Sequence, residues 1–212
     1  MLKDKTMKKL ALIFGIFVGL WGNDSQGGQL LAQICQGVEV RGCTSYFEEN
    51  CNNGDYHACG IVAQVHRIVG DYENAIRYGT IACEKIDHNV PATTTTINGN
   101  EVTFPKELAK QSKTAECHNI GNTFVEGKHF KVDFSKAISP FEEACALDSA
   151  IDCRNAGIIH LEGGNGVKKD TNRAKKIFAV GCNLGDMQSC QAFRAIKCVG
   201  SMCFYDSFNL FN

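Results

Sequence analysis

The chain has 212 residues, with 22 basic and 23 acidic side chains and a formal net charge of -1. This balance argues against a nucleic-acid-binding protein, because such proteins carry a basic face. The length suits one domain or one repeat array. Twelve cysteines in so short a chain are typical of a disulfide-bonded protein from an oxidising compartment.

The first residues are typical of a secretion signal. The apolar run Leu10–Trp21 follows four lysines, at positions 3, 5, 8 and 9, and it is too short to span a bilayer comfortably. We predict that residues 1–22 are a signal peptide, with Gly22 or Ser25 as the last residue removed. The alternative is a buried or anchoring helix. Cleavage would leave 18 basic and 22 acidic side chains, and the protein would be exported, either periplasmic or secreted, and not integral to a membrane.

The cysteines are evenly spaced along the chain. Seven residues separate the members of four pairs: Cys35 and Cys43, Cys51 and Cys59, Cys145 and Cys153, Cys182 and Cys190. On one unbroken helix the Cα atoms of such a pair would lie about 12 Å apart, whereas a disulfide needs roughly 4.4–6.8 Å. If these pairs are bridged, the chain must reverse between the two cysteines. The pattern therefore predicts helical hairpins with a disulfide at each turn.

A second pattern precedes the cysteines at positions 83, 145 and 182. An alanine stands eight residues before each of them, a small residue stands directly before it, and an aromatic residue lies between. The three triplets are Ala75, Tyr78 and Ala82; Ala137, Phe141 and Ala144; and Ala174, Phe178 and Gly181. Each triplet shares one face of a helix. We expect this face to pack closely on a neighbouring helix.

The segments after two of the cysteines also match. Cys153-Arg154-Asn155-Ala156-Gly157 is echoed by Cys117-His118-Asn119-Ile120-Gly121. A glycine inside a helix costs roughly 1 kcal/mol relative to alanine, so we expect a close helix contact at both glycines.

Turn signals mark the ends of the expected helices. Residues 163–170 (GGNGVKKD) form a predicted turn, in which Gly166 ends one helix and Asp170 caps the next. Two shorter turns, Cys51–Asp55 and Cys182–Asp186, place a glycine where a helix must stop and an aspartate where the next begins.

Together, the alanine–aromatic pattern, the C-x7-C turn, the C-x-N-x-G helix and the G-x-G-V-x-x-D linker resemble Sel1-like repeats. The cysteine-rich form resembles the secreted Helicobacter cysteine-rich protein family. The resemblance covers about Gln29–Cys198 and is strongest over Cys145–Cys190. It implies an all-α fold, an α/α superhelical solenoid of disulfide-stapled, TPR-like hairpins, and we assign the array to residues 29–203.

The resemblance also implies a disulfide pattern: Cys35–Cys43, Cys51–Cys59, Cys83–Cys117, Cys145–Cys153 and Cys182–Cys190. Elimination leaves Cys198–Cys203, although Cys190–Cys198 competes because it has the regular spacing. Closing a nine-residue loop stabilises a fold by roughly 2.5 kcal/mol on the chain-entropy model. Six bridges would give on the order of 15 kcal/mol, comparable with the stability of an ordinary domain.

One interval departs from the repeat. Cys83 and Cys117 are 34 residues apart, 26 more than the regular spacing, and we assign the insertion to residues 89–114. Two threonine- and valine-containing runs around Asn98-Gly99 predict a β-hairpin at about residues 93–104. The hairpin is either a surface insertion of small entropic cost or a recognition element with an exposed strand edge.

The aromatic C-terminal tail, residues 204–212, has two interpretations. It either caps the last repeat, since a repeat array must cover its open end, or it forms a surface for a partner.

Motifs for catalysis are missing from the sequence. It contains no S-x-x-K with K-T-G, no G-x-S-x-G elbow, no phosphate loop and no H-E-x-x-H. The six histidines are dispersed, so we predict no metal site and no cofactor. His118 follows Cys117, but a disulfide-bonded cysteine is not a nucleophile. We therefore assign no catalytic residue.

The leading functional prediction is a binding scaffold. Curved helical stacks present a concave groove to protein or peptide ligands, which suits an envelope adaptor or a secreted host-interaction factor. We place Asn119, Asn155 and His160 in this groove, although the two asparagines could instead bond backbone groups between helices. The alternative is enzymatic, because the resemblance implies a penicillin-binding protein with weak β-lactamase activity and hence a β-lactam or peptidoglycan-like ligand.

Overall fold

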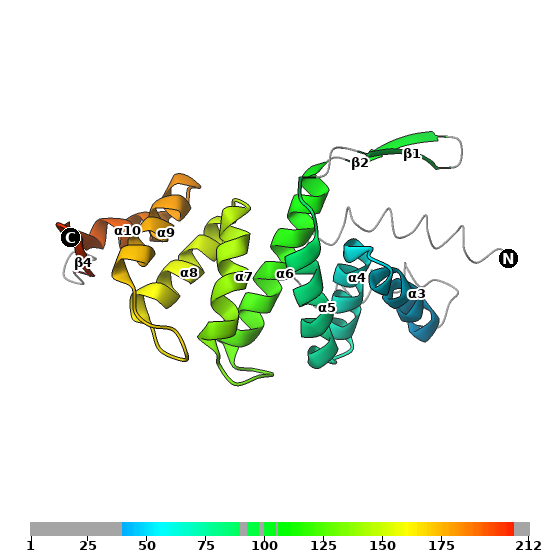
Figure 1. The fold of residues 1–212 in the computed structure, drawn as a ribbon, viewed down its shortest axis with the longest axis horizontal. Helices are drawn as coiled ribbons and strands as arrows, with labels where there is room; N and C mark the ends of the chain where they lie inside the picture. The colour runs from blue at the N-terminus through cyan, green and yellow to red at the C-terminus, as the bar shows by residue number, and fades with distance from the viewer. Residues whose placement is uncertain (1–39, 90–92, 98–99, 105, 206–212) are drawn as a thin grey trace. The chain divides into compact units, whose positions relative to one another are not determined.

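The computed structural model describes residues 40–89, 93–97, 100–104 and 106–205 (Figure 1). Three predictions depend on residues outside these ranges: the signal peptide, the Cys35–Cys43 disulfide, which involves Cys35, and most of the aromatic tail. None of the described helices has both the length and the apolar character needed to cross a membrane.

The chain divides into two compact units, Met1–Glu116 and Cys117–Asn212. The described part of the first contains α3 (Val40–Asn52), α4 (Tyr56–Ile68), α5 (Tyr72–Lys85), β1 (Thr93–Ile97), β2 (Asn100–Phe104) and the beginning of α6 (Lys106–Glu126). The second contains the rest of α6, α7 (Phe134–Ala146), α8 (Ala150–Glu162), α9 (Thr171–Asn183), α10 (Met187–Ala195), β3 (Ile196–Val199) and β4 (Met202–Tyr205). Within each unit consecutive helices pack on one another as hairpins.

The two short turns predicted at Cys51–Asp55 and Cys182–Asp186 are confirmed. Gly54 and Gly185 both have a φ of 93°, which glycine adopts at no steric cost. Asp55 then caps α4 by accepting hydrogen bonds from the N–H groups of His57 and Ala58. Asp186 caps α10 by accepting one from Ser189. The chain therefore reverses between the paired cysteines, as the disulfide geometry requires.

Four disulfides join cysteines that are close in sequence. Their Cα separations are 4.8, 4.6, 4.5 and 4.0 Å for Cys51–Cys59, Cys145–Cys153, Cys182–Cys190 and Cys198–Cys203. The competing Cys190–Cys198 pair is therefore not formed. Cys83 and Cys117 are also disulfide-bonded, and their pairing with each other stays a prediction.

The small–aromatic–small faces form the core. All nine residues of the three triplets are buried. In the first unit Tyr78 and Ala82 pack with Phe47 and Val62 of the neighbouring helices. In the second unit Gly121 lies directly against the ring of Phe141. The expected close contact at the helix glycines is confirmed, and so is the all-α hairpin fold with a small antiparallel β-hairpin, β1–β2.

The structure corrects one predicted helix end. Helix α8 ends at Glu162 and is followed by Gly163, with a φ of 68°, so the prediction that Gly166 ends this helix is wrong. Gly166 instead belongs to a two-residue turn with Asn165, closed by hydrogen bonds between Gly164 and Val167 at 2.8 and 3.0 Å. Asn165 and Gly166 have φ values of 45° and 92°, which is typical of a type I′ turn.

A second hairpin was not anticipated. Strands β3 and β4 pair antiparallel, with Cys198 opposite Cys203. Ile196 of β3 packs with Ala174 and Phe178 of α9, so this hairpin covers the last helix pair of the second unit.

Candidate functional site

Helix α8 buries one side and exposes another. Its buried side includes Cys153, Ala156 and Ile159. Ile151 and Ile158 are 45% and 40% exposed, seven residues apart and hence on one face of the helix. Two large aliphatic side chains on one exposed helix face offer an apolar contact surface.

A pair of asparagines accompanies this apolar surface. Asn155 lies on α8 between the two isoleucines, and Asn119 occupies the equivalent repeat position on α6, two residues after a cysteine. Both side chains are half-buried. The backbone carbonyl of Asn119 accepts a hydrogen bond from Thr123, but among the described residues neither side-chain amide has a hydrogen-bonding partner. We call Asn119, Ile151, Asn155 and Ile158 the α6–α8 face.

A buried polar network holds α6 and α8 in place beside this face. Nδ1 of His118 on α6 lies 2.7 Å from Oδ1 of Asp152 on α8. Asp152 is fully buried, and its second oxygen accepts a hydrogen bond from Ser149 at 2.5 Å. On the other side of the ring, the amide nitrogen of Asn122 lies 2.7 Å from Nε2 of His118.

The electrostatics of this network favour a charged imidazole. The hydrogen bond to Asp152 raises the pKa of His118, and this effect outweighs the opposing effect of burial. A positive His118 against a buried carboxylate fixes both side chains, because an ion pair in a poorly hydrated site is strong once formed. In the charged form both ring nitrogens donate, so Nε2 pairs with Asn122 when the carboxamide turns its oxygen toward the ring. The network therefore positions the helices and does not present a free base.

An ion pair ties α8 to the next helix. Nη1 of Arg154 lies 2.9 Å from Oδ1 of Asp186, the same aspartate that caps α10. Arg154 stands one residue after Cys153, as His118 stands one after Cys117. In the second unit, the residue after the second cysteine of a pair thus joins α6 to α8 and α8 to the beginning of α10.

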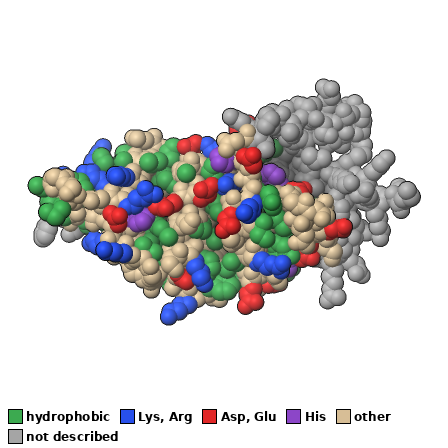
Figure 2. Space-filling model, in the orientation of Figure 1, with side chains coloured by type: hydrophobic (Ala, Val, Ile, Leu, Met, Phe, Trp, Pro, Cys, Tyr) green, Lys and Arg blue, Asp and Glu red, His purple; other side chains and the backbone are tan. Residues whose placement is uncertain are grey.

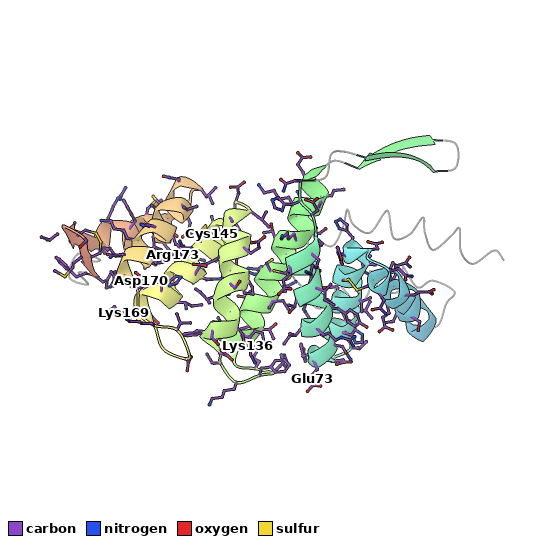
Figure 3. All side chains as sticks on the ribbon, in the orientation of Figure 1. Glu73, Lys136, Cys145, Lys169, Asp170 and Arg173 are labelled. Atoms are coloured by element: carbon purple, nitrogen blue, oxygen red, sulfur yellow. A yellow bond between two sulfur atoms is a disulfide. The ribbon has the colours of Figure 1, made fainter. Side chains whose placement is uncertain are left out.

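His160 lies apart from the α6–α8 face. It stands five positions after Asn155, about 140° further around the helix, so the two side chains lie on different sides of α8. Its Nε2 atom lies 2.9 Å from Oε1 of Glu142 on α7. Arg173, labelled at the start of α9 in Figure 3, contacts the same carboxylate at 3.1 Å. The structure therefore places Asn119 and Asn155 at equivalent repeat positions of α6 and α8, and it places His160 in a separate ion-pair cluster.

The same ion pair occurs in the first unit. His66 of α4 lies 3.4 Å from Glu48 of α3, and the two are 18 residues apart, as are His160 and Glu142. In both cases the glutamate stands three residues before a first cysteine and the histidine seven after a second one. Because the pair recurs at the same positions, it is a feature of the repeat. Its constant spacing from the cysteines could have predicted the His–Glu contact from the sequence.

Metal-binding clusters are absent from the part of the chain that the structure describes, and its disulfides occupy the cysteines. No group of three or more His, Cys, Asp or Glu side chains in the described ranges could hold a metal ion, and the ten cysteines from Cys51 to Cys203 are disulfide-bonded. Acidic and basic side chains are interspersed with hydrophobic ones over the face shown in Figure 2. The α6–α8 face supplies amide hydrogen bonds and apolar contact.

Comparisons with known proteins give partial matches. No family model matches the chain. Over 91 residues it is 36% identical to cytochrome c oxidase assembly factor 7 of Xenopus tropicalis and 32% identical to cytochrome c oxidase assembly factor 7A of Xenopus laevis. Each match covers 41% of this chain and 39% of the relative, so it spans about two fifths of the relatives' length.

Two solved structures are similar as well. One is a Sel1 repeat protein from Oxalobacter formigenes, with a TM-score of 0.46 and 19% identity over 81% of this chain and 62% of the other. The second is Helicobacter pylori cysteine rich protein B, with a TM-score of 0.39 and 20% identity over 71% of this chain and 91% of the other.

Proposed function

We propose that this disulfide-rich helical repeat protein is an exported scaffold that binds an extended segment of a protein partner on its α6–α8 face. The observation that carries the proposal is that the side-chain amides of Asn119 and Asn155 have no hydrogen-bonding partner among the described residues. The two asparagines stand at equivalent repeat positions of α6 and α8. A carboxamide both donates and accepts hydrogen bonds, so each can bond the N–H and C=O groups of an extended peptide.

The isoleucines supply the remaining contact. Apolar side chains of the bound segment would pack against Ile151 and Ile158, which are exposed in this structure. The His118–Asp152 and Arg154–Asp186 ion pairs fix the positions of α6, α8 and α10, and hence the position of this face. A preformed surface of this kind loses little conformational entropy on binding.

Export is proposed from the covalent chemistry. Disulfides persist in oxidising compartments and are rare in the cytosol, and residues 1–22 have the composition of a secretion signal. The names of the matched Xenopus proteins describe assembly factors. A scaffold that holds a protein client during assembly is in keeping with those names. The enzymatic alternative, a penicillin-binding protein with weak β-lactamase activity, has no specific observation in its favour.

The proposal is tested by crosslinking from the face itself. A photoreactive amino acid replaces Ile158, with the same residue at the exposed Lys176 of α9 as the control position. We expect the Ile158 position to give adducts with a defined polypeptide in the envelope fraction. The crosslinked segment is mapped by mass spectrometry and synthesised as a peptide for calorimetry.

Matched variants then decide which groups bind the peptide. Asn119→Ala with Asn155→Ala should weaken binding about tenfold, since each net hydrogen bond contributes roughly 0.5–1.5 kcal/mol. The exposed amide of Asn183 is the control, and Asn183→Ala should leave the affinity unchanged. Equal adducts at both crosslinker positions, or an undiminished affinity of the double variant, would refute the proposal. Turnover of nitrocefin by the oxidised protein would favour the enzyme.

A further inference from the structure

Three described connections between hairpins close with the same hydrogen bond. In each, the N–H of the aspartate that caps the next helix bonds a carbonyl near the end of the preceding one. The pairs are Asp71 to His66 at 2.9 Å, Asp133 to Phe124 at 3.0 Å and Asp170 to His160 at 2.7 Å. Residues 69–71 suffice for the first connection, whereas the second takes residues 127–133 and the third 163–170. The extra residues of the two long connections are therefore not needed to join the helices.

The two long connections carry exposed lysines. The second connection (GKHFKVD) carries Lys128 and Lys131, and the third (GGNGVKKD) carries Lys168 and Lys169. All four are exposed. The third connection is held by its Asn165-Gly166 turn and by the close approach of Gly163 to the backbone of Lys169, so its two lysines stand on a well-defined loop.

Both long connections lie at one edge of the second unit. The N–H of Ser135, in the first turn of α7, donates a hydrogen bond to the carbonyl of Asn165 at 3.3 Å. Ser135 follows the second connection by two residues, so the third connection contacts the helix that the second one leads into. Lys136 of the same turn and Lys169 are labelled in Figure 3, and Figure 2 shows Lys and Arg side chains projecting along this edge. We call Lys128, Lys131, Lys136, Lys168 and Lys169 the lysine edge.

Four carboxylates also lie at this edge, those of Glu126, Asp133, Glu162 and Asp170. Asp133 accepts hydrogen bonds from Ser135 and Lys136 backbone groups, and Asp170 accepts one from Arg173. Glu126 pairs with Lys128 at 2.9 Å, and Glu162 is exposed at the end of α8. Nζ of Lys136 lies 3.6 Å from Oδ2 of Asp133, so among the described residues Lys131, Lys168 and Lys169 are the lysines of this edge without an ion pair.

We infer that the lysine edge adsorbs the protein to an anionic lipid surface. A specific protein–protein interface takes about 20–30 residues a side, which is more than the two connections provide. A lipid surface needs neither area nor shape complementarity. Each lysine near such a surface strengthens adsorption about fivefold at physiological ionic strength, and the effect falls with salt.

Vesicle sedimentation with the full oxidised chain tests the inference. Anionic vesicles of phosphatidylcholine with about 30 mol% phosphatidylglycerol are compared with vesicles of pure phosphatidylcholine, which carry no net charge. The edge variant combines Lys131→Gln, Lys168→Gln and Lys169→Gln. The control variant, with the same change in charge, combines Lys85→Gln, Lys176→Gln and Lys197→Gln at exposed positions outside the connections. The four lysines before Leu10 are the same in both, so a difference between the variants reports the edge.

We expect the edge variant to partition at least tenfold more weakly than the wild type on anionic vesicles, with the control variant close to the wild type. Acetylation of lysines in the presence of vesicles should be reduced at Lys131, Lys168 and Lys169 but not at Lys176. Equal loss in both variants, or no loss in the edge variant, overturns the inference. Edge-dependent capture by poly-glutamate without capture by anionic vesicles overturns it in favour of an acidic protein segment.

Discussion

The ring of Phe178 on α9 occupies the space above Gly157 on α8: a Cβ built at Gly157 would lie 2.6 Å from Cε1 of the ring. Phe141 on α7 stands in the same relation to Gly121 on α6. The missing side chain is thus what lets α9 place its aromatic ring on α8, and α7 place its ring on α6. Each glycine weakens its own helix but permits the contact that builds the array.

Substitution at this contact should reverse the usual effect of alanine in a helix. Gly157→Ala gains roughly 1 kcal/mol of helix propensity, but the new methyl group must displace a fully buried ring, and overpacking costs about 1–3 kcal/mol. Gly60→Ala is the matched control, because its nearest neighbour would be at 3.5 Å, in ordinary contact. We expect denaturant titration to show a less stable Gly157→Ala protein and an unchanged or more stable Gly60→Ala protein. A stabilised Gly157→Ala protein would contradict this packing.

The disulfides should carry much of the stability. Replacing Cys145 and Cys153 together by alanine should lower the free energy of unfolding by roughly 2–3 kcal/mol, because the bridge closes a short loop in the unfolded chain. Treatment with a thiol reductant should unfold the protein at room temperature. Circular dichroism measures both effects, and a helical spectrum that survives complete reduction would show that packing alone maintains the fold.

The His118–Asp152 pair predicts a pH dependence of stability. The pKa of His118 is raised in the folded protein by its hydrogen bond to Asp152, so the folded state binds the proton more tightly than the unfolded one. The resulting stabilisation is complete below the unfolded-state pKa of about 6.5 and is lost as the pH rises through the raised folded-state pKa. We expect the wild type to lose stability over this window.

A variant isolates that contribution. His118→Gln keeps a hydrogen-bond donor but cannot become charged, so the difference in unfolding free energy between wild type and variant should shrink with rising pH. At pH 6 the variant should be less stable by about 1–3 kcal/mol, because a buried Asp152 loses its charged partner. An NMR titration of the His118 ring measures its pKa directly. A value at or below that of a free histidine would contradict the prediction.

Local chemistry explains which features were predictable. The buried triplets, such as Ala174, Phe178 and Gly181, and the Asp186 cap follow from side-chain periodicity and backbone hydrogen bonding within a few residues. The His118–Asp152 pair joins residues 34 positions apart, so it depends on how two helices are placed, which periodicity does not determine. His160 was assigned to the groove for its polarity alone, since the sequence does not show which side of α8 faces α7.

The β3–β4 hairpin was missed for a related reason. Its strands have only four residues each. Cys198 also stands at the regular spacing after Cys190, which favoured a further helical hairpin at this position. Tertiary contact with α9 decides its structure: besides the packing of Ile196, Lys175 Nζ donates a hydrogen bond to the Ile196 carbonyl at 2.7 Å. When a short segment gains its stability from a neighbouring helix, its own sequence predicts its secondary structure only weakly.

That packing makes a sharp prediction within one strand. Ile196 is 1% exposed and contacts Ala174 and Phe178, whereas Val199, three residues on, is 70% exposed. Ile196→Ala should lower the free energy of unfolding by about 2–5 kcal/mol, the range for deleting a buried aliphatic side chain. Val199→Ala should change it by less than about 0.5 kcal/mol, since it removes an exposed group. Equal effects of the two substitutions in denaturant titration would mean that the hairpin does not cover α9, and that the last helix pair of the second unit is stabilised without it.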